Sequence, residues 1–145
     1  MRYRTIHTLV CFLLLMAANI QADNLTQPVS LVPCPVSIVP GTGNFHFSEE
    51  TTFAVENEEQ AVEVRRFTAL LTRAAGFTPR IKVGNKKGDV CLTTDVGLKE
   101  EAYKLEITAK RINIHAADVQ GFFYALQSIR QLLPAAIEGG QVVTG

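Results

Sequence analysis

The chain has 145 residues, of which 47% are hydrophobic, and its 14 Lys+Arg balance its 14 Asp+Glu. That length corresponds to about one domain of globular composition, which excludes collagen-like, low-complexity and disordered proteins. The balanced charge argues against a nucleic-acid-binding protein, and a complete (β/α)₈ barrel, which needs roughly 250 residues, cannot fit.

Residues 1–22 have the features of a secretory signal peptide. Arg2 and Arg4 precede an apolar run at 9–18, and small residues follow. Cleavage is expected after Ala22, with Ala18 as the alternative. The apolar run is too short to cross a membrane as a helix, so we expect an exported protein, periplasmic or extracellular, without a membrane span.

Two cysteines remain after removal of the signal peptide, because Cys11 lies within it. In an oxidising compartment Cys34 and Cys91 could pair, closing a loop of about 57 residues and stabilising the fold by roughly 4 kcal/mol. The alternative is two separate buried thiols, since free cysteine packs as a small apolar residue.

The first part of the mature chain predicts extended structure. After a polar lead at 23–28, a proline-rich segment precedes a short predicted strand at 36–39 and a turn at 40–43. Phe45 and Phe47 alternate with polar residues, which predicts a half-buried strand, and 51–55 continues the strand-rich region.

A helix is predicted next. Asn57 with Gln60 three positions later forms a capping-box pattern, and Gly76 stands at the expected C-terminal stop. The apolar stripe that should face the core is Val64, Phe67, Leu71 and Ala74. The other side, expected to be a solvated face, carries Glu63, Arg65, Arg66, Thr68 and Arg73.

The remaining residues predict four strands and a second helix. Strands are expected at 79–83 and 90–93, and alternating patterns at 103–107 and 112–116 predict a hairpin with one buried face. Asp118 is expected to cap a helix that Pro134 ends, with Phe122, Leu126, Ile129 and Leu133 as its stripe. The predicted fold class is α+β: an antiparallel or mixed sheet of about six strands with both helices packed on one face.

No group of side chains in the sequence suffices for catalysis, and no cofactor or metal site is predicted. His46 and His115 fall on the polar sides of their strands. The acidic pairs Glu49-Glu50, Glu58-Glu59 and Glu100-Glu101 are neighbours in sequence, as in surface or capping positions, whereas a glycosidase holds two carboxyl groups across a scissile bond.

Two stretches resemble the N-terminal, non-catalytic domain of family 20 glycoside hydrolases, the bacterial β-N-acetylhexosaminidases. The first is LVPCPVSIVPGTGNFHFSEETTFAV at 31–55, with Pro33-Cys34-Pro35 before a Gly-rich turn and an aromatic residue. The second, EAYKLEITAKRINIHAADVQGFFYALQSIRQLLP at 101–134, is more specific. Its matching positions are Tyr103, Leu105, Ile112, Ile114, Gly121, Phe123, Tyr124, Leu126, Gln127, Gln131 and Leu132.

The resemblance implies that 29–134 is an accessory domain and that 135–145 begins a linker to a catalytic (β/α)₈ barrel, its partner in cis. In that family an adjacent Asp-Glu pair of the barrel drives substrate-assisted removal of terminal β-linked GlcNAc or GalNAc. No Asp-Glu dipeptide occurs here, so no catalytic residue is transferred and the chain alone is expected to be inactive. It would be a fragment, a truncated product or a free-standing domain.

Other interpretations remain open at this stage. Related accessory domains occur in family 84 β-N-acetylglucosaminidases and in α-glucuronidases. A stand-alone carbohydrate- or protein-binding module is a third interpretation, weakened by the absence of Trp. The apolar helix ending at Leu133 could dock on a partner or pack on its own sheet, and Phe123, Ala125 and Leu132 are the residues that point to a partner.

Overall fold

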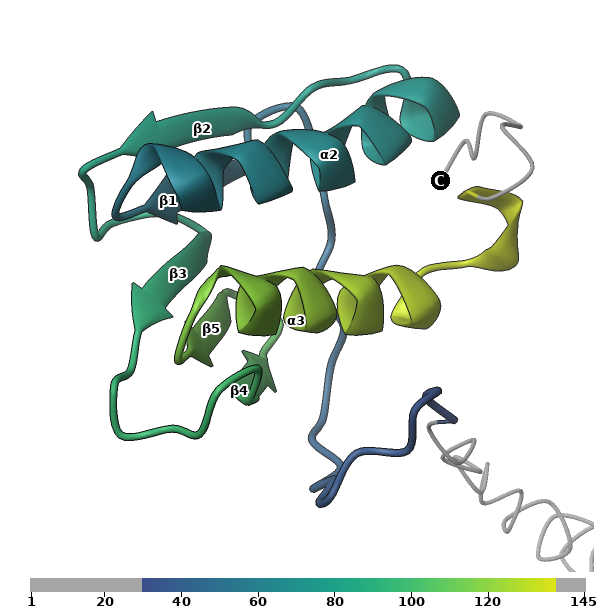
Figure 1. The fold of residues 1–145 in the computed structure, drawn as a ribbon. Coiled ribbons are helices and arrows are strands. Elements are labelled where there is room, and N and C mark those ends of the chain that lie inside the picture. The colour runs from purple at the N-terminus through teal and green to yellow at the C-terminus, as the bar shows by residue number, and fades with distance from the viewer. Residues whose placement is uncertain (1–29, 138–145) are drawn as a thin grey trace, which may run out of the picture.

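A computed structural model describes residues 30–137 (Figure 1). The predicted signal peptide, its cleavage site at Ala22, the predicted lead at 23–28 and most of the predicted linker at 135–145 lie outside this range. The described elements, in chain order, are β1 (Thr52–Val55), α2 (Glu58–Ala75), β2 (Arg80–Val83), β3 (Val90–Thr94), β4 (Tyr103–Ile107), β5 (Ile112–Ala116), α3 (Val119–Leu132) and the short 3₁₀ helix η1 (Ala135–Ile137).

The strands form one mixed sheet in the order β2-β1-β3-β5-β4. β1 runs parallel to β2 and β3, and β3 runs parallel to β5, whereas β4 pairs antiparallel with β5 as the predicted hairpin requires. The predicted α+β class with a mixed sheet is therefore confirmed. Both edge strands carry charged side chains, Arg80 and Lys82 on β2 and Lys104 and Glu106 on β4, which discourage pairing with a further strand.

The sheet has five strands where about six were predicted. Of the predicted strands, neither 36–39 nor 45–48 forms one. Pro35 and Pro40 flank the first segment and supply no backbone N–H for a ladder. In the second, Phe45 and Phe47 are partly buried and alternate with exposed residues as predicted, yet no strand pairs with them. Their partners are other rings: the centroid of Phe47 lies 6.2 Å from that of Phe53 and 5.9 Å from that of Phe67.

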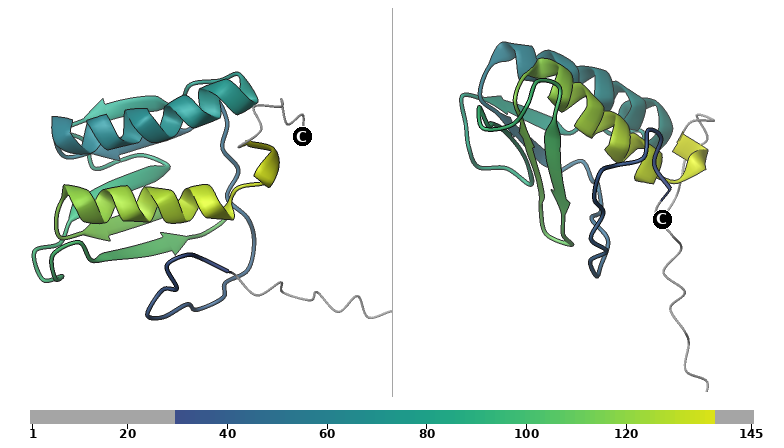
Figure 2. Two further views of the ribbon diagram at one scale, coloured as in Figure 1. Left: turned by 45° about the vertical axis from the view of Figure 1, so that its right-hand side comes forward. Right: turned by 60° about the horizontal axis from the view of Figure 1, so that its bottom comes forward.

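Both helices lie on the same face of the sheet, side by side and in the same direction (Figure 2). The predicted caps are present: Asn57 Oδ1 accepts the N–H of Gln60 at 2.9 Å, and Asp118 Oδ1 accepts that of Gly121 at 2.8 Å. Gly76 ends α2 with φ +78°, a left-handed conformation that favours glycine. The parallel arrangement places both capped N-termini at one end of the helix layer.

The core fills the space between the helices and the sheet. The predicted stripe of α2 is buried, and Phe122, Leu126 and Ile129 of α3 are almost fully covered by the domain's own sheet. The prediction that Glu63 and Thr68 lie on a solvated face was wrong, since both are more than nine-tenths buried. Glu63 accepts a hydrogen bond from Arg66, and the Thr68 hydroxyl donates to the carbonyl of Arg65. Among the described residues, no helix is long and apolar enough to cross a membrane.

Candidate functional site

The acidic pairs and the histidines occupy separate positions in the fold. Glu49-Glu50 lies in a turn before β1, Glu58-Glu59 in the first turn of α2, and Glu100-Glu101 between β3 and β4, and all six residues are exposed. His46 is exposed ahead of β1, whereas His115 lies in β5 in register with Thr93 and Lys104. Within residues 30–137, no three His, Cys, Asp or Glu side chains gather as a metal site would require.

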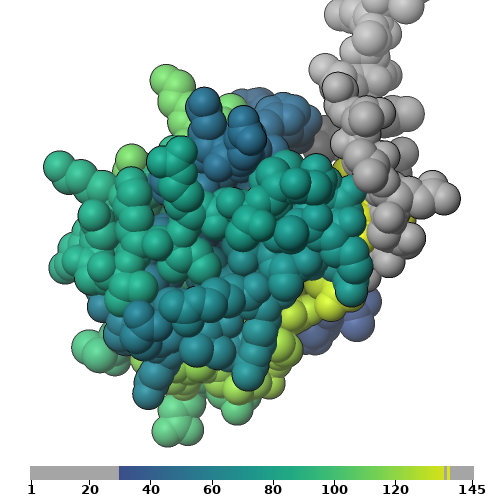
Figure 3. Space-filling view, turned by 90° about the horizontal axis from the view of Figure 1, so that it is seen from above, coloured from purple at the N-terminus to yellow at the C-terminus, as the bar shows by residue number. Residues whose placement is uncertain are grey.

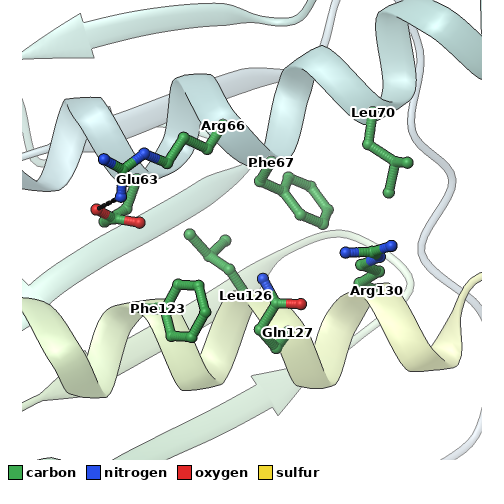
Figure 4. A pocket seen from close by; sticks show the side chains of 8 residues that line it. All are labelled: Glu63, Arg66, Phe67, Leu70, Phe123, Leu126, Gln127 and Arg130. Carbon is green, nitrogen blue, oxygen red and sulfur yellow. Dashed lines mark hydrogen bonds and ion pairs between the residues drawn. The ribbon is translucent and has the colours of Figure 1, made fainter.

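A narrow groove of about 160 Å³ runs between α2 and α3 (Figure 4). Phe67, Leu70 and Leu126, which line it, are each more than nine-tenths buried already. At its mouth the guanidinium of Arg66 donates to Glu63 Oε1 at 2.6 Å. Sites for small organic ligands usually measure about 300–1,000 Å³ and present convergent polar groups, so this groove is a packing seam of the helix layer. The eight lining residues are Glu63, Arg66, Phe67, Leu70, Phe123, Leu126, Gln127 and Arg130.

A second, wider depression lies at the N-terminal ends of the two helices, lined among others by Asn57, Gln60, Thr94 and Asp118. Its polar groups are engaged in holding the backbone. Asp118 Oδ2 accepts the N–H of Glu101 at 2.9 Å while Oδ1 caps α3, and these backbone hydrogen bonds lower the pKa of the Asp118 carboxyl.

Glu56, next to this depression, ties three elements together. Its Oε2 accepts the N–H of Thr94 at 2.9 Å, and its own N–H donates to Gln60 Oε1 at 2.8 Å. The Gln60 amide also donates to Thr94 Oγ1 at 3.2 Å. Hydrogen bonding from Thr94 lowers the pKa of Glu56, outweighing the partial burial that raises it. Sequence reasoning found Gln60 as half of a capping box but missed its partner Thr94 on β3, 34 residues away.

Asp89 is a third carboxylate used to fix the backbone. Its Oδ2 accepts both the N–H of Thr52 at 2.9 Å and the hydroxyl of Thr52 at 3.0 Å, joining the start of β3 to the start of β1. The hydrogen bond from the backbone of Thr52 is the main cause that lowers the pKa of Asp89. A general acid at neutral pH needs a raised carboxyl pKa, whereas the pKa values of Glu56, Asp89 and Asp118 are all lowered.

Both cysteines of the described chain are free thiols, Cys34 exposed and Cys91 buried. Cys91 packs beneath the connection between β2 and β3, with Sγ 3.3 Å from the carbonyl oxygen of Gly88. Of the two thiols that the alternative expected to be buried, Cys91 is buried and Cys34 is exposed, and the pairing of the two cysteines in an oxidising compartment stays a prediction.

The residues that carried the family resemblance have structural roles. A Cβ at Gly121 would lie 2.7 Å from the carbonyl oxygen of Ala102 and 3.0 Å from Cβ of Ala116, so only glycine lets α3 approach the sheet this closely. The Tyr103 hydroxyl lies 2.6 Å from Ser128 Oγ, linking β4 to α3. Gln131 bonds to the backbone of Val32. These three residues of the motif therefore stabilise the fold of the domain.

Comparison with known proteins agrees with that interpretation. The sequence model described as "Glycosyl hydrolase family 20, domain 2" matches residues 28–144. A Beta-hexosaminidase of Porphyromonas gingivalis is 27% identical over 142 residues, which are 92% of this chain and 18% of that protein. A Lacto-N-biosidase of Bifidobacterium bifidum is 30% identical over 115 residues, 76% of this chain and 10% of that protein.

Solved structures give the same result. The N-acetyl-beta-hexosaminidase of Streptomyces plicatus superposes with a TM-score of 0.70 at 28% identity, covering 78% of this chain and 23% of that one. The beta-N-acetylhexosaminidase of Bacteroides fragilis superposes with a TM-score of 0.54 at 26% identity, covering 70% and 20%. The chain thus spans less than a quarter of the length of each of these relatives.

Proposed function

This chain belongs to glycosyl hydrolase family 20, as the family's domain 2, and on that premise we propose that it is the non-catalytic accessory domain of an exported β-N-acetylhexosaminidase. The match over residues 28–144 carries the proposal, because it takes in the whole described fold. The motifs in the sequence also resemble family 20, and the match favours it over the alternatives, family 84 and the α-glucuronidases.

The hydrogen bonds of three carboxylates support the assignment as non-catalytic. Glu56, Asp89 and Asp118 each accept backbone N–H groups and have lowered pKa values, so they are ionised acceptors that hold loops and helix ends. Protonating a glycosidic oxygen requires a carboxyl group that keeps its proton near neutral pH. These three carboxylates, whose pKa values are lowered, are thus suited to holding the backbone and not to acid catalysis.

The hydrolytic activity would reside in a (β/α)₈ barrel joined in cis to this domain. Its reaction would be the removal of terminal β-linked GlcNAc or GalNAc from glycans, in line with the names of the hexosaminidase relatives. The second curated relative carries the name Lacto-N-biosidase, so a lacto-N-bioside belongs among the substrates to test. Export is proposed from the basic and apolar pattern of residues 1–22.

The direct test is hydrolysis by the isolated 145-residue chain. Aryl β-N-acetylglucosaminide, aryl β-N-acetylgalactosaminide and aryl lacto-N-bioside would be offered to purified chain, with a family 20 hexosaminidase as the positive control. We expect no release of the aryl group from any of the three. Turnover that co-purifies with the chain and disappears when the chain is unfolded would overturn the non-catalytic assignment.

A further inference from the structure

Charge is distributed unevenly along this chain. Residues 64–88 contain no Asp or Glu, yet they hold half of the chain's 14 Lys+Arg. Figure 3 views the domain from the side on which α2 and β2 lie, and teal atoms of this part of the chain form most of the surface in view. The balanced total charge therefore hides a local surplus of positive charge, which attracts ligands of opposite sign. The basic residues of this stretch are Arg65, Arg66, Arg73, Arg80, Lys82, Lys86 and Lys87.

Arg80, Lys82, Lys86 and Lys87 lie on β2 and on the connection at 84–89 that leads from β2 to β3. All four side chains are exposed. None of them forms an ion pair with another residue of the described chain, in contrast to the arginines near the start of α2. Their positive charges are therefore open to a ligand from outside the domain.

The backbone brings these cations to one face of the sheet. Arg80 and Lys82 alternate with Ile81, which packs against the core, so both point to the face opposite the helices. Lys82 is in register with Ala54, which is only 1% exposed although it faces the same way. The connection covers it: a Cβ on Gly88 would lie 3.0 Å from the Cβ of Ala54. The lysines of the connection thus lie over this face of β1, beside β2.

Two carboxylates near these cations do not neutralise them by ion pairing. The pKa values of Glu56 and Asp89 are lowered chiefly by hydrogen bonds from threonines, and further by the charge of Lys86 on Glu56 and of Lys82 on Asp89. Each carboxylate already accepts a backbone N–H at 2.9 Å. Because neither forms an ion pair with a lysine, the cations keep their capacity to bind another anion.

The connection that carries two of the cations is held in place. Gly84 and Asp89, at its two ends, donate backbone N–H groups to carbonyl oxygens of β1 at 2.8 and 2.9 Å. Within it, Asn85 Oδ1 accepts the N–H of Lys87 at 2.9 Å. The backbone beneath the lysines is therefore ordered before any ligand arrives, which lowers the entropy lost on binding.

We propose that the basic edge, defined as Arg80, Lys82, Lys86 and Lys87, binds an acidic polysaccharide, a glycan chain that carries sulfate or uronate groups along its length. The proposal rests on the proposed function, which makes a glycan the polymer that this domain would meet. Neither depression described above is lined by any of the four residues. Cations spread along a strand and a connection fit a chain of repeated anions, whereas a single small anion would need them to converge.

The test measures binding of the native polypeptide that contains this domain to immobilised chondroitin sulfate. The control polymer is the same glycan after removal of its sulfates and reduction of its carboxylates. We expect saturable binding to the acidic polymer at low ionic strength, binding at least about tenfold weaker to the neutral one, and release near 1 M salt, where charges are screened within roughly 3 Å. Equal binding to both polymers, or binding to neither, would overturn the proposal.

A matched pair of double variants locates the contact. Lys86→Gln with Lys87→Gln removes two charges from the basic edge, and Lys99→Gln with Lys110→Gln removes two from exposed lysines outside it. We expect the first variant to bind chondroitin sulfate about tenfold more weakly and the second to bind as the parent does. Lys82→Gln alone gives the same test if circular dichroism shows that the first variant is unfolded. Equal binding by the K86Q/K87Q and K99Q/K110Q variants would overturn the proposal.

Further results separate the proposal from its premise. Hydrolysis of an aryl β-N-acetylglucosaminide by the native polypeptide should be the same in all variants. An active polypeptide that does not bind the acidic polymer would overturn the proposal alone, whereas an inactive one that binds it would overturn the proposed function and not the binding. Tighter binding to double-stranded DNA or to vesicles of anionic lipid than to chondroitin sulfate would overturn the polysaccharide as the partner.

Discussion

The side-chain amide of Gln131 pairs with the backbone of Val32 across 99 residues of sequence: Oε1 accepts the Val32 N–H and Nε2 donates to the Val32 carbonyl, both at 2.9 Å. In an antiparallel sheet, two facing residues can exchange two backbone hydrogen bonds. Here the side-chain amide of Gln131 takes the place of one of the two backbones. It attaches the segment ahead of β1 to the end of α3.

Gln131→Ala is expected to release that segment while leaving the rest of the fold in place. The Val32 amide should exchange much faster, and the free energy of unfolding should fall by about 1 kcal/mol or less, because both bonds are exposed to water. Hydrogen exchange and chemical denaturation measure the two effects. Gln127→Ala, on the same helix, is the matched control and should leave Val32 unchanged; equal exchange at Val32 in both variants would contradict the pairing.

Gly121→Ala is expected to destabilise the domain by roughly 1–3 kcal/mol, in spite of the better helix propensity of alanine. The new methyl group would meet the Ala102 carbonyl oxygen at 2.7 Å and push α3 away from the sheet. Gly41→Ala is the control, since nothing lies within 4 Å of the added carbon there. A G121A variant as stable as G41A in urea denaturation would show that α3 does not approach the sheet as closely as the structure has it.

The Tyr103–Ser128 hydrogen bond should contribute a coupling of about 1 kcal/mol. A double-mutant cycle with Tyr103→Phe and Ser128→Ala measures it, because each substitution removes one partner with little change of shape. Thermal or chemical unfolding of the four proteins supplies the free energies. Strictly additive effects would mean that the 2.6 Å contact between the hydroxyls does not stabilise the fold.

Acid is expected to weaken the domain through Glu56 and Asp89. The pKa of each carboxyl is lowered in the folded state, chiefly by Thr94 for Glu56 and by the Thr52 backbone for Asp89. Each therefore stabilises the fold above its unfolded-state pKa of about 4, and this contribution is lost as pH falls through the lower folded-state value.

Glu56→Gln isolates one of these contributions. The variant should be less stable than the parent at pH 6, and its stability should decline less between pH 6 and pH 3, as followed by urea denaturation at each pH. Glu49→Gln is the control: Glu49 is exposed and forms no side-chain hydrogen bond in the described structure, so its profile should follow the parent. An E56Q profile parallel to the parent would contradict the role of Glu56.

Much of the fold was predictable because its signals are local. Asn57 and Gly76 delimit α2, Asp118 and Pro134 delimit α3, and the β4–β5 hairpin follows from alternation on both sides of a short turn. Each of these features depends on residues close together in sequence. The caps and the buried stripes could therefore be assigned residue by residue.

The failures have one physical cause, which is dependence on distant partners. The alternation of Phe45 and Phe47 correctly predicts which side is buried. It cannot reveal that the rings of Phe53 and Phe67 cover Phe47, or that no strand pairs with this segment. The same limit hides the parallel order of β2, β1 and β3, the Gln131–Val32 bonds and the burial of Glu63 beneath Arg66. The local sequence pattern predicts which face of an element is buried, but the fold as a whole determines what packs against that face.

The candidate site was limited in the same way. Sequence reasoning found no catalytic group, and the described carboxylates with shifted pKa values hold backbone N–H groups instead. The exposure of Val36, Ile38 and Val39 could not be predicted, because in sequence these residues resemble the core residues of a short strand.

The measurement that tests the central claim most directly is electrophoresis of the native protein under activity-preserving conditions, probed in parallel with an antibody to this domain and a fluorogenic β-N-acetylglucosaminide. We expect a single species, several hundred residues long, that binds the antibody and hydrolyses the substrate. A species recognised by the antibody but no longer than this chain, with hydrolysis elsewhere in the gel or absent, would contradict the assignment of this domain to a β-N-acetylhexosaminidase.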